Sequence, residues 1–169
     1  MSTKFDAENA ENLEEIEKQW AVKAVEQAQV YWNLLAAVPP RSLRLTKMDD
    51  EIFEDFSNSF PEFIKDHSQL TKLDEDTIKN KENKERWRNF MMRYEKTVKD
   101  YNFGTMVRPK ADEEYGQENS MFVPRMQFYA IEIARNRLGL NDAIHLVANK
   151  DAEEMKAAKA ARKAKKASS

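Results

Sequence analysis

Side chains that commonly catalyse reactions are few in this 169-residue chain, and they stand far apart. The only histidines are His67 and His145, and neither belongs to a metal-binding pattern such as HExxH. We expect His67 to be a surface or capping residue and His145 to be a core residue with satisfied hydrogen bonds. Cysteine is absent, which excludes disulfides, thiolate nucleophiles and cysteine-based zinc sites.

Paired carboxylates, such as Glu113–Glu114, occur in polar sequence where nothing would separate their pKa values for acid–base catalysis. The three glycines, Gly104, Gly116 and Gly139, are too far apart to form a phosphate-binding loop. We therefore expect no catalytic residues, no cofactor, no metal and no small-molecule substrate. A chain of this kind works by binding another macromolecule.

Composition favours one soluble domain with tails. Hydrophobic residues make up 41% of the chain and charged residues 34%, while the net charge of −2 offers no strong overall field to nucleic acid or anionic lipid. No targeting peptide and no run of about 20 apolar residues is visible. We expect a cytoplasmic protein, with the nucleus as an additional location, and no membrane partner.

Helical spacing of apolar residues predicts a first helix over about 9–38, which Pro39–Pro40 stops. Its predicted inner face comprises Leu13, Ile16, Trp20, Ala24, Ala28, Tyr31 and Leu35. A second helix begins near Met48 with Asp49 or Asp50 as its cap, and Pro61 either kinks it or restarts it. After a predicted loop over 68–76, a third helix covers 76–101. The apolar stripe of this third helix comprises Trp87, Phe90, Met91, Tyr94, Val98 and Tyr101.

Two short apolar runs, FGTMVRP and ENSMFVP, flank the acidic loop KADEEYGQ. We interpret them as a two-stranded β-hairpin that rests on the helices, because an isolated hairpin is marginal in water. The alternative is an irregular loop that crosses the helical core.

Pro124 opens a further helix and Gly139 closes it. Apolar residues cover most of its circumference, and Arg125, Glu132 and Asn136 share one narrow stripe. Two interpretations are open: an internal network in which Arg125 and Glu132 pair with each other or with backbone, or a polar ridge at a binding face. The candidate partner-binding residues are Arg125, Asn136, Arg137, Asn141 and Asp142.

Beyond Asn141 or Asp142, which caps a short predicted helix over 143–149, we expect Ile144, Leu146 and Val147 to pack on the core. The remaining segment is rich in alanine and lysine, and both its composition and its charge order favour helix. It is either a solvated, partly helical tail or a basic arm for RNA, a ribosome surface or an acidic partner. Its basic residues are Lys156, Lys159, Arg162, Lys163, Lys165 and Lys166.

The predicted fold is therefore mainly α: a single compact helical domain with a small two-stranded β-hairpin and a basic C-terminal helical tail. We divide the chain into an acidic N-terminal tail (1–8), a helical core domain (9–150) and the basic tail (151–169).

The block NFGTMVRP…YGQENSMFVPRMQFYAIEIARNRLGLNDAIH resembles the family of polysaccharide biosynthesis domain-containing proteins, which occurs in fungi, animals and archaea. The resemblance extends over nearly the whole core, from WAVKAVEQAQVYWNLL to LNDAIH, and leaves out the basic tail. It implies a non-enzymatic, dedicated chaperone for newly made translation elongation factor 1-alpha. Such a chaperone would act in the cytosol, at or near the ribosome, with the nascent polypeptide-associated complex. It would shield the GTPase domain until GTP binding completes its fold, after which a zinc-finger chaperone continues the process.

The resemblance identifies no individual client contact. Five methionines concentrate in the second half of the chain, where they either adapt a binding face to its client or fill the core: Met91, Met92, Met106, Met121 and Met126. Two other functions remain open. One is a ribosome- or RNA-associated binding module that acts through the basic tail. The other is an enzyme of glycan assembly, which the family name suggests and the residues do not support.

Overall fold

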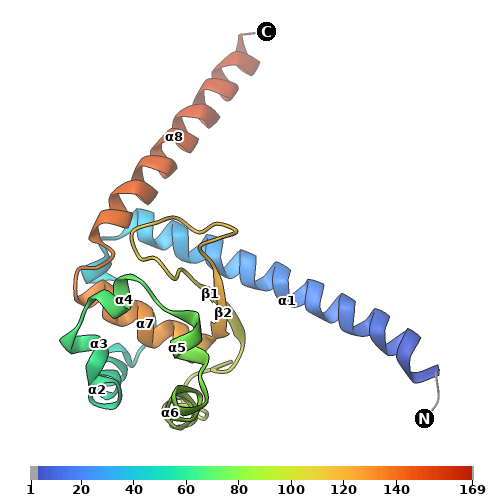
Figure 1. Ribbon diagram of the computed structural model, residues 1–169. Coiled ribbons are helices and arrows are strands. Elements are labelled where there is room, and N and C mark those ends of the chain that lie inside the picture. The colour runs from blue at the N-terminus through green and yellow to red at the C-terminus, as the bar shows by residue number, and fades with distance from the viewer. Residues whose placement is uncertain (1–3, 169) are drawn as a thin grey trace.

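The computed structural model describes residues 4–168, and within this range the side chains of Glu15 and of residues 18–168. It is mainly helical with one two-stranded antiparallel sheet, as predicted. The elements between the first and last helices gather in one body. Helices α1 (Lys4–Ala37) and α8 (Asp142–Ala167) pack together where they join this body, and each then extends away from it (Figure 1).

Helix α1 begins at Lys4, before the predicted start, and ends ahead of Pro39. The buried residues Ala24, Ala28, Tyr31 and Leu35 confirm the predicted inner face over its second half. The prediction was wrong for Trp20, which is 60% exposed because it packs at the surface against the partly exposed ring of Phe103, at 6.5 Å between centroids. The side chains of Leu13 and Ile16, also predicted to face inward, lie outside the described residues.

The next segment is divided more finely than the sequence predicted. It consists of the short η1 (Pro40–Ser42), followed by α2 (Asp49–Ser59), α3 (Pro61–Lys65), α4 (Ser68–Thr71), α5 (Glu75–Lys79) and α6 (Lys81–Met92). Pro61 restarts the chain as a separate helix. Neither Asp49 nor Asp50 caps α2, because the Asp49 carboxylate turns back to accept hydrogen bonds from the backbone N–H groups of Leu45 and Thr46, at 2.8 and 2.7 Å.

Two boundaries in this segment were wrongly predicted. The expected loop over 68–76 contains α4 and the start of α5. The expected helix over 76–101 is interrupted at Asn80, whose side chain accepts a hydrogen bond from the N–H of Asn83 and so caps α6. After Met92 the chain continues as turns. The predicted apolar stripe still packs, since Trp87, Phe90, Tyr94 and Val98 are all buried.

Aromatic rings fill the lower part of the body between α2, α3 and α6. The rings of Phe60 and Trp87 stack at 4.2 Å between centroids. Phe56, one helical turn before Phe60, lies 5.6 Å from the Phe60 ring and 5.9 Å from the Trp87 ring. Burying rings of this size is a large hydrophobic contribution, and their mutual geometry adds to it. These rings are part of one continuous hydrophobic core, to which α7 (Arg125–Arg137), α1 and α8 also contribute buried residues.

The predicted β-hairpin is confirmed: β1 (Gly104–Val107) pairs in antiparallel register with β2 (Met121–Pro124). Side chains alternate across it. The four residues of the inner face are buried: Thr105, Val107, Met121 and Val123. On the outer face, Met106 lies directly opposite Phe122, which is 54% exposed.

Gly139 follows α7 with a φ of 79°, as expected for the glycine that closes a helix. A Cβ at this position would collide with the Arg41 guanidinium. The chain then enters α8, which is one continuous helix rather than a short helix followed by a partly helical tail.

Within α8, Ile144 and Ala148 are buried against the body, while Leu146 is 70% exposed and Val147 is also exposed. The packing predicted for Leu146 and Val147 was therefore wrong. At about 100° per residue they rotate away from the face that carries Ile144 and Ala148. His145 is half-buried and its Nδ1 contacts the carbonyl oxygen of Leu35, whereas His67 is exposed. None of the described helices is long and apolar enough to cross a membrane.

Candidate functional site

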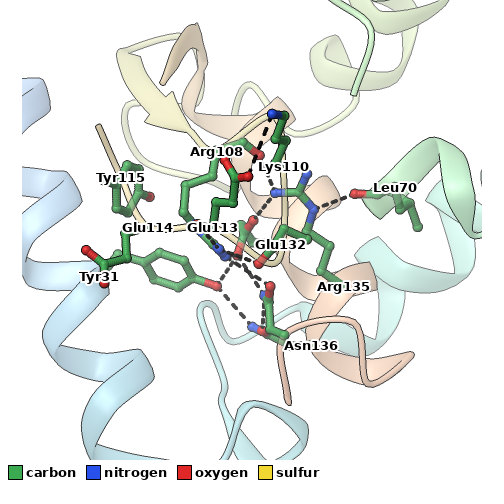
Figure 2. Close-up of polar contacts among 12 residues, drawn as sticks. Tyr31, Leu70, Arg108, Lys110, Glu113, Glu114, Tyr115, Glu132, Arg135 and Asn136 are labelled. Carbon is green, nitrogen blue, oxygen red and sulfur yellow. Dashed lines mark hydrogen bonds and ion pairs between the residues drawn. The ribbon is translucent and has the colours of Figure 1, made fainter. Parts of the chain in front are cut away.

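The densest group of polar side chains lies inside the body. We call it the interior network (Figure 2). Its six members come from α1, the segment after β1, α7 and the residue that precedes α8, and all are buried: Tyr31, Arg108, Glu132, Arg135, Asn136 and Asn141.

Glu132 is the centre of the interior network. Its carboxylate accepts hydrogen bonds from Arg135 Nη1 at 2.8 Å, from Asn141 Nδ2 at 3.0 Å and from the Tyr31 hydroxyl. The Arg108 guanidinium lies 3.6 Å away. Burial raises the pKa of this carboxyl, but the positive charges of Arg108 and Arg135 outweigh burial and hold the pKa below its ordinary value. Glu132 is thus ionised and bonded on both oxygens.

The two arginines fasten backbone segments to this carboxylate. Arg135 donates to the carbonyl oxygens of Leu70 at 2.8 Å, Arg108 at 2.6 Å and Pro109 at 2.9 Å. Arg108 donates to the carbonyls of Ala111 and Glu113, at 2.6 and 3.1 Å. The loop over 108–120 is therefore held against α7 and α4.

The side chain of Asn119 holds the loop together by hydrogen bonds to its backbone. Its side chain accepts from the Lys110 N–H at 2.8 Å and donates to the carbonyls of Lys110, Glu113 and Glu114. Tyr115, in the same loop, donates a hydrogen bond from its hydroxyl to the Met106 carbonyl at 3.2 Å. Hydrogen bonds thus join the loop to itself and to the hairpin.

The interior network is not arranged for chemistry in this conformation. Arg108, Glu132 and Arg135 expose none of their surface, so no substrate reaches them. Burial, followed by the adjacent Glu132, raises the pKa of Tyr31 well above its ordinary value, which keeps the hydroxyl protonated as a donor. Among the described side chains, those of Glu15 and residues 18–168, no group of His, Cys, Asp and Glu could hold a metal ion.

The structure separates the residues that the sequence proposed for partner binding. Asn136 and Asn141 belong to the interior network and are buried. Arg125 and Arg137 are partly buried and Asp142 is exposed; they form ion pairs with Asp100 at 3.6 Å, Asp50 at 2.5 Å and Arg41 at 3.1 Å, respectively. Arg125 and Arg137 stand at opposite ends of α7, about 18 Å apart along its axis, so these residues do not make one face.

Of the two interpretations of the α7 stripe, the internal network is the one that the structure contains. Its partners differ from those expected, because Glu132 pairs with Arg135 and Arg108 rather than with Arg125. The spacing of Glu132 and Arg135, three residues apart on a helix, was a usable signal. Nothing in the sequence pointed to Arg108, which approaches from another element.

Beside the interior network, α1 and the outer face of the hairpin enclose an apolar concavity, which we call the surface groove. Six residues define it: Trp20, Val25, Trp32, Phe103, Met106 and Phe122. It consists of two open depressions of about 470 and 460 Å³ that share Phe122 as a wall. Val25 is 57% exposed, and Trp20 and Phe122 are similarly open. Clustered apolar side chains of this size on a surface mark an interaction site.

The rim of the surface groove is acidic on the side of the loop. Glu114 and Tyr115 line the larger depression, and the neighbouring Asp112, Glu113 and Glu118 are exposed. Lys110 offsets only part of this charge, at 3.7 Å from Glu113. Beside Phe103, Lys23 and Arg125 lie over the aromatic ring at 5.7 and 5.5 Å. The groove therefore suits an apolar segment with basic residues near its acidic rim.

This chain is similar to known proteins in structure and in sequence. A solution NMR structure of protein yst0336 from Saccharomyces cerevisiae aligns with a TM-score of 0.73 and 57% identity, over 85% of this chain and 98% of that one. The PBDC1 homolog of Schizosaccharomyces pombe is 62% identical over 144 residues, which are 85% of this chain and 97% of that protein. Human Protein PBDC1 is 40% identical over 149 residues, which are 88% of this chain and 62% of that protein.

The model of the family described as PBDC1 protein matches residues 16–146. The match includes α1 from residue 16, the interior network, the hairpin and the first turn of α8, and it ends before the basic segment. This chain belongs to the PBDC1 protein family, the polysaccharide biosynthesis domain-containing proteins.

Proposed function

We propose that this protein is a non-enzymatic, client-specific chaperone that binds newly made translation elongation factor 1-alpha through the surface groove. Two arguments support the proposal. The family resemblance implies this client, and the exposure of Trp20, Val25 and Phe122 on a rigid scaffold provides a surface suited to it. The exposed groove is the observation that carries the binding role.

A chaperone must bind the incompletely folded client more tightly than the finished one, since a ligand shifts an equilibrium only by its differential affinity. An apolar groove meets this requirement. The client segments that fit it are exposed before folding and buried afterwards. Binding of GTP by the client would then withdraw the segment, and the chaperone needs no nucleotide site of its own.

Rigidity of the groove favours capture, because a preformed surface loses little conformational entropy on binding. The hairpin is fastened by its buried inner face and by the loop that the interior network holds. Of the five methionines, Met121 and Met126 fill the core and Met91 is partly buried, whereas Met106 lies in the groove. Met106 can adapt its shape to a client segment.

Capture of newly synthesised protein from a translating cytosolic extract tests the proposal, with captured chains identified by mass spectrometry. We expect elongation factor 1-alpha to be enriched among them. Trp20→Glu combined with Phe122→Glu should lower its recovery at least tenfold. Met92→Glu is the matched control, since Met92 has the same 54% exposure as Phe122 and lines neither depression.

Undiminished capture by a folded double variant would exclude the groove as the client site. Absence of elongation factor 1-alpha from the captured chains would exclude the client itself.

Release driven by the client has a separate test. Isothermal titration of the purified protein with GTP and with ATP should give no binding heat, and measurable affinity would contradict the proposal.

The proposed setting is the cytosol, at or near the ribosome, with the nascent polypeptide-associated complex as a further partner. Co-sedimentation of the protein with translating ribosomes, with and without that complex, tests this setting.

A further inference from the structure

The outer part of α8 is an arm with an unusual charge distribution. Residues 152–168 are exposed along a helix that points away from the body (Figure 1). From Met155 to Ser169 the sequence contains six Lys or Arg residues and no Asp or Glu. The arm lies beyond residue 146, where the family match ends, so its role is separable from that of the surface groove.

The cations of the arm gather on one side. At about 100° per residue, five of them fall within roughly 120° of the helix circumference. We call these five the basic stripe: Lys156, Lys159, Arg162, Lys163 and Lys166. The stripe extends about 15 Å along the axis at 1.5 Å per residue. Alanines occupy the opposite side, at 157, 160, 161 and 164.

The stripe differs from the mixed charge of an ordinary solvated helix. Glu153 stands three residues before Lys156, but the other four residues of the stripe have no Asp or Glu three or four positions before or after them. Because charge is screened beyond about 8 Å at physiological salt, the overall net charge of −2 does not cancel the field of a projecting arm.

The composition of the arm indicates which class of anionic partner it can bind. A membrane-surface helix needs large apolar residues opposite its cations, and Met155 is the single large apolar residue after Asn149. Recognition of single-stranded bases needs aromatic side chains for stacking, and the arm contains none. A straight row of cations on a helix suits a regular row of phosphates.

We infer that the outer part of α8 binds the phosphate backbone of double-stranded nucleic acid through the basic stripe, without reading sequence. The binding energy comes from release of counterions as lysine and arginine neutralise phosphates. Affinity therefore depends steeply on salt and little on base sequence.

Fluorescence anisotropy of the full-length protein with a labelled RNA duplex and a labelled DNA duplex of about 20 base pairs tests the inference. With about five phosphates neutralised, the logarithm of affinity should fall with the logarithm of salt with a slope of about −4 to −5 on DNA. The duplex that binds with the higher affinity identifies whether RNA or DNA is the source of the phosphates. Saturable binding to neither duplex at about 50 mM salt would overturn the inference.

A charge-preserving variant tests the stripe itself. Lys159→Ala with Ala160→Lys, and Lys163→Ala with Ala164→Lys, keep composition and net charge but divide the stripe between two faces. We expect at least fivefold weaker binding and a shallower salt slope. Ala157→Gln with Ala164→Gln alters the opposite face and should bind like the native protein. Equal affinity of the charge-preserving variant would overturn the one-sided geometry.

Two competitors at the same salt concentration test the partner class. Polyglutamate and vesicles that contain phosphatidylserine should bind at least tenfold more weakly than the duplex. Equal or tighter binding of either would overturn the assignment to nucleic acid. Helix content by circular dichroism and capture of the client should be unchanged in every arm variant, which separates this test from that of the proposed function.

Discussion

The interior network and the surface groove meet along β1 and the loop that follows it, yet they are built from opposite chemistry. Arg108 belongs to the network and lies buried, whereas Met106, two residues earlier, lines the groove. Charged side chains are enclosed and paired, and large apolar ones face solvent. Here buried charge holds a loop in position, and apolar surface is left exposed.

Enclosing three ionised groups is costly unless each is paired and hydrogen-bonded. The interior network meets this condition nearly completely; Arg108 Nε is buried without a hydrogen-bond partner in the described part of the chain. What the network provides is an anchor for the loop, because the guanidinium groups of Arg108 and Arg135 donate hydrogen bonds to the backbone carbonyls of the loop. Because the loop forms one wall of the groove, these hydrogen bonds also determine the shape of the groove.

Removing the central charge should have the largest effect. Glu132→Gln leaves two buried guanidinium groups without a carboxylate, and we expect a loss of about 3–5 kcal/mol in the free energy of unfolding. Urea denaturation measures it. Glu114→Gln, an exposed acid of the same loop, is the control and should change stability little. A loss below about 1 kcal/mol for Glu132→Gln would show that the network is not a principal source of stability.

Neighbouring residues on the two faces of β2 should respond differently. Met121→Ala opens a cavity in the core and should cost about 2–5 kcal/mol. Phe122→Ala removes an exposed ring and should change the free energy of unfolding by less than about 0.5 kcal/mol while weakening client capture. Thermal denaturation of both variants checks the contrast. A large stability loss for Phe122→Ala would mean that the groove is part of the core.

Acid should weaken the network gradually. Because Arg108 and Arg135 hold the folded-state pKa of Glu132 below its ordinary value of 4.5, its ionisation stabilises the fold above that ordinary value. This contribution is lost as pH falls through the depressed folded-state pKa. The stability gap between the native protein and Glu132→Gln should therefore narrow from pH 7 towards pH 3 in urea titrations. A gap that is constant with pH would contradict this assignment.

The smallest effect is expected at Arg137. It pairs with Asp50 at the surface and lies over the Phe53 ring at 5.4 Å, so Arg137→Glu should lower the melting temperature much less than Glu132→Gln. Arg137 lines neither depression of the groove, and client capture should be retained. Lost capture at an unchanged melting temperature would extend the client surface to this end of α7, as the sequence alone had proposed.

Much of the fold was readable from local patterns. Pro39–Pro40 ends α1, the two apolar runs pair as the hairpin, and Pro124 and Gly139 bracket α7, because proline and glycine act through their own backbone geometry. Predictions of helix boundaries and caps failed where a side chain could form hydrogen bonds with more than one backbone segment. Asn80 interrupts the third predicted helix by capping α6, and Asp49 turns back to the preceding loop instead of capping α2.

Less of the candidate site could be predicted from the sequence. Helical spacing drew attention to Glu132 and Asn136 on α7, but not to Arg108, which follows β1, or to Tyr31 from α1, which complete the network. Trp20 was assigned to the core on periodicity, which cannot tell a buried position from one that packs at the surface. Alternation along β2 separates Met121 from Phe122, but only the packing against α7 decides which of the two faces inward.

The sequence by itself determined the helical class, the hairpin, the family and the shortage of reactive groups, since these depend on composition and on local sequence patterns. The tertiary structure decided which polar residues are enclosed and which aromatic residues are exposed. Burial is a property of the whole assembly: Arg108 and Glu132 stand 24 residues apart in the chain and share one charge cluster only after α7 has packed beneath the hairpin.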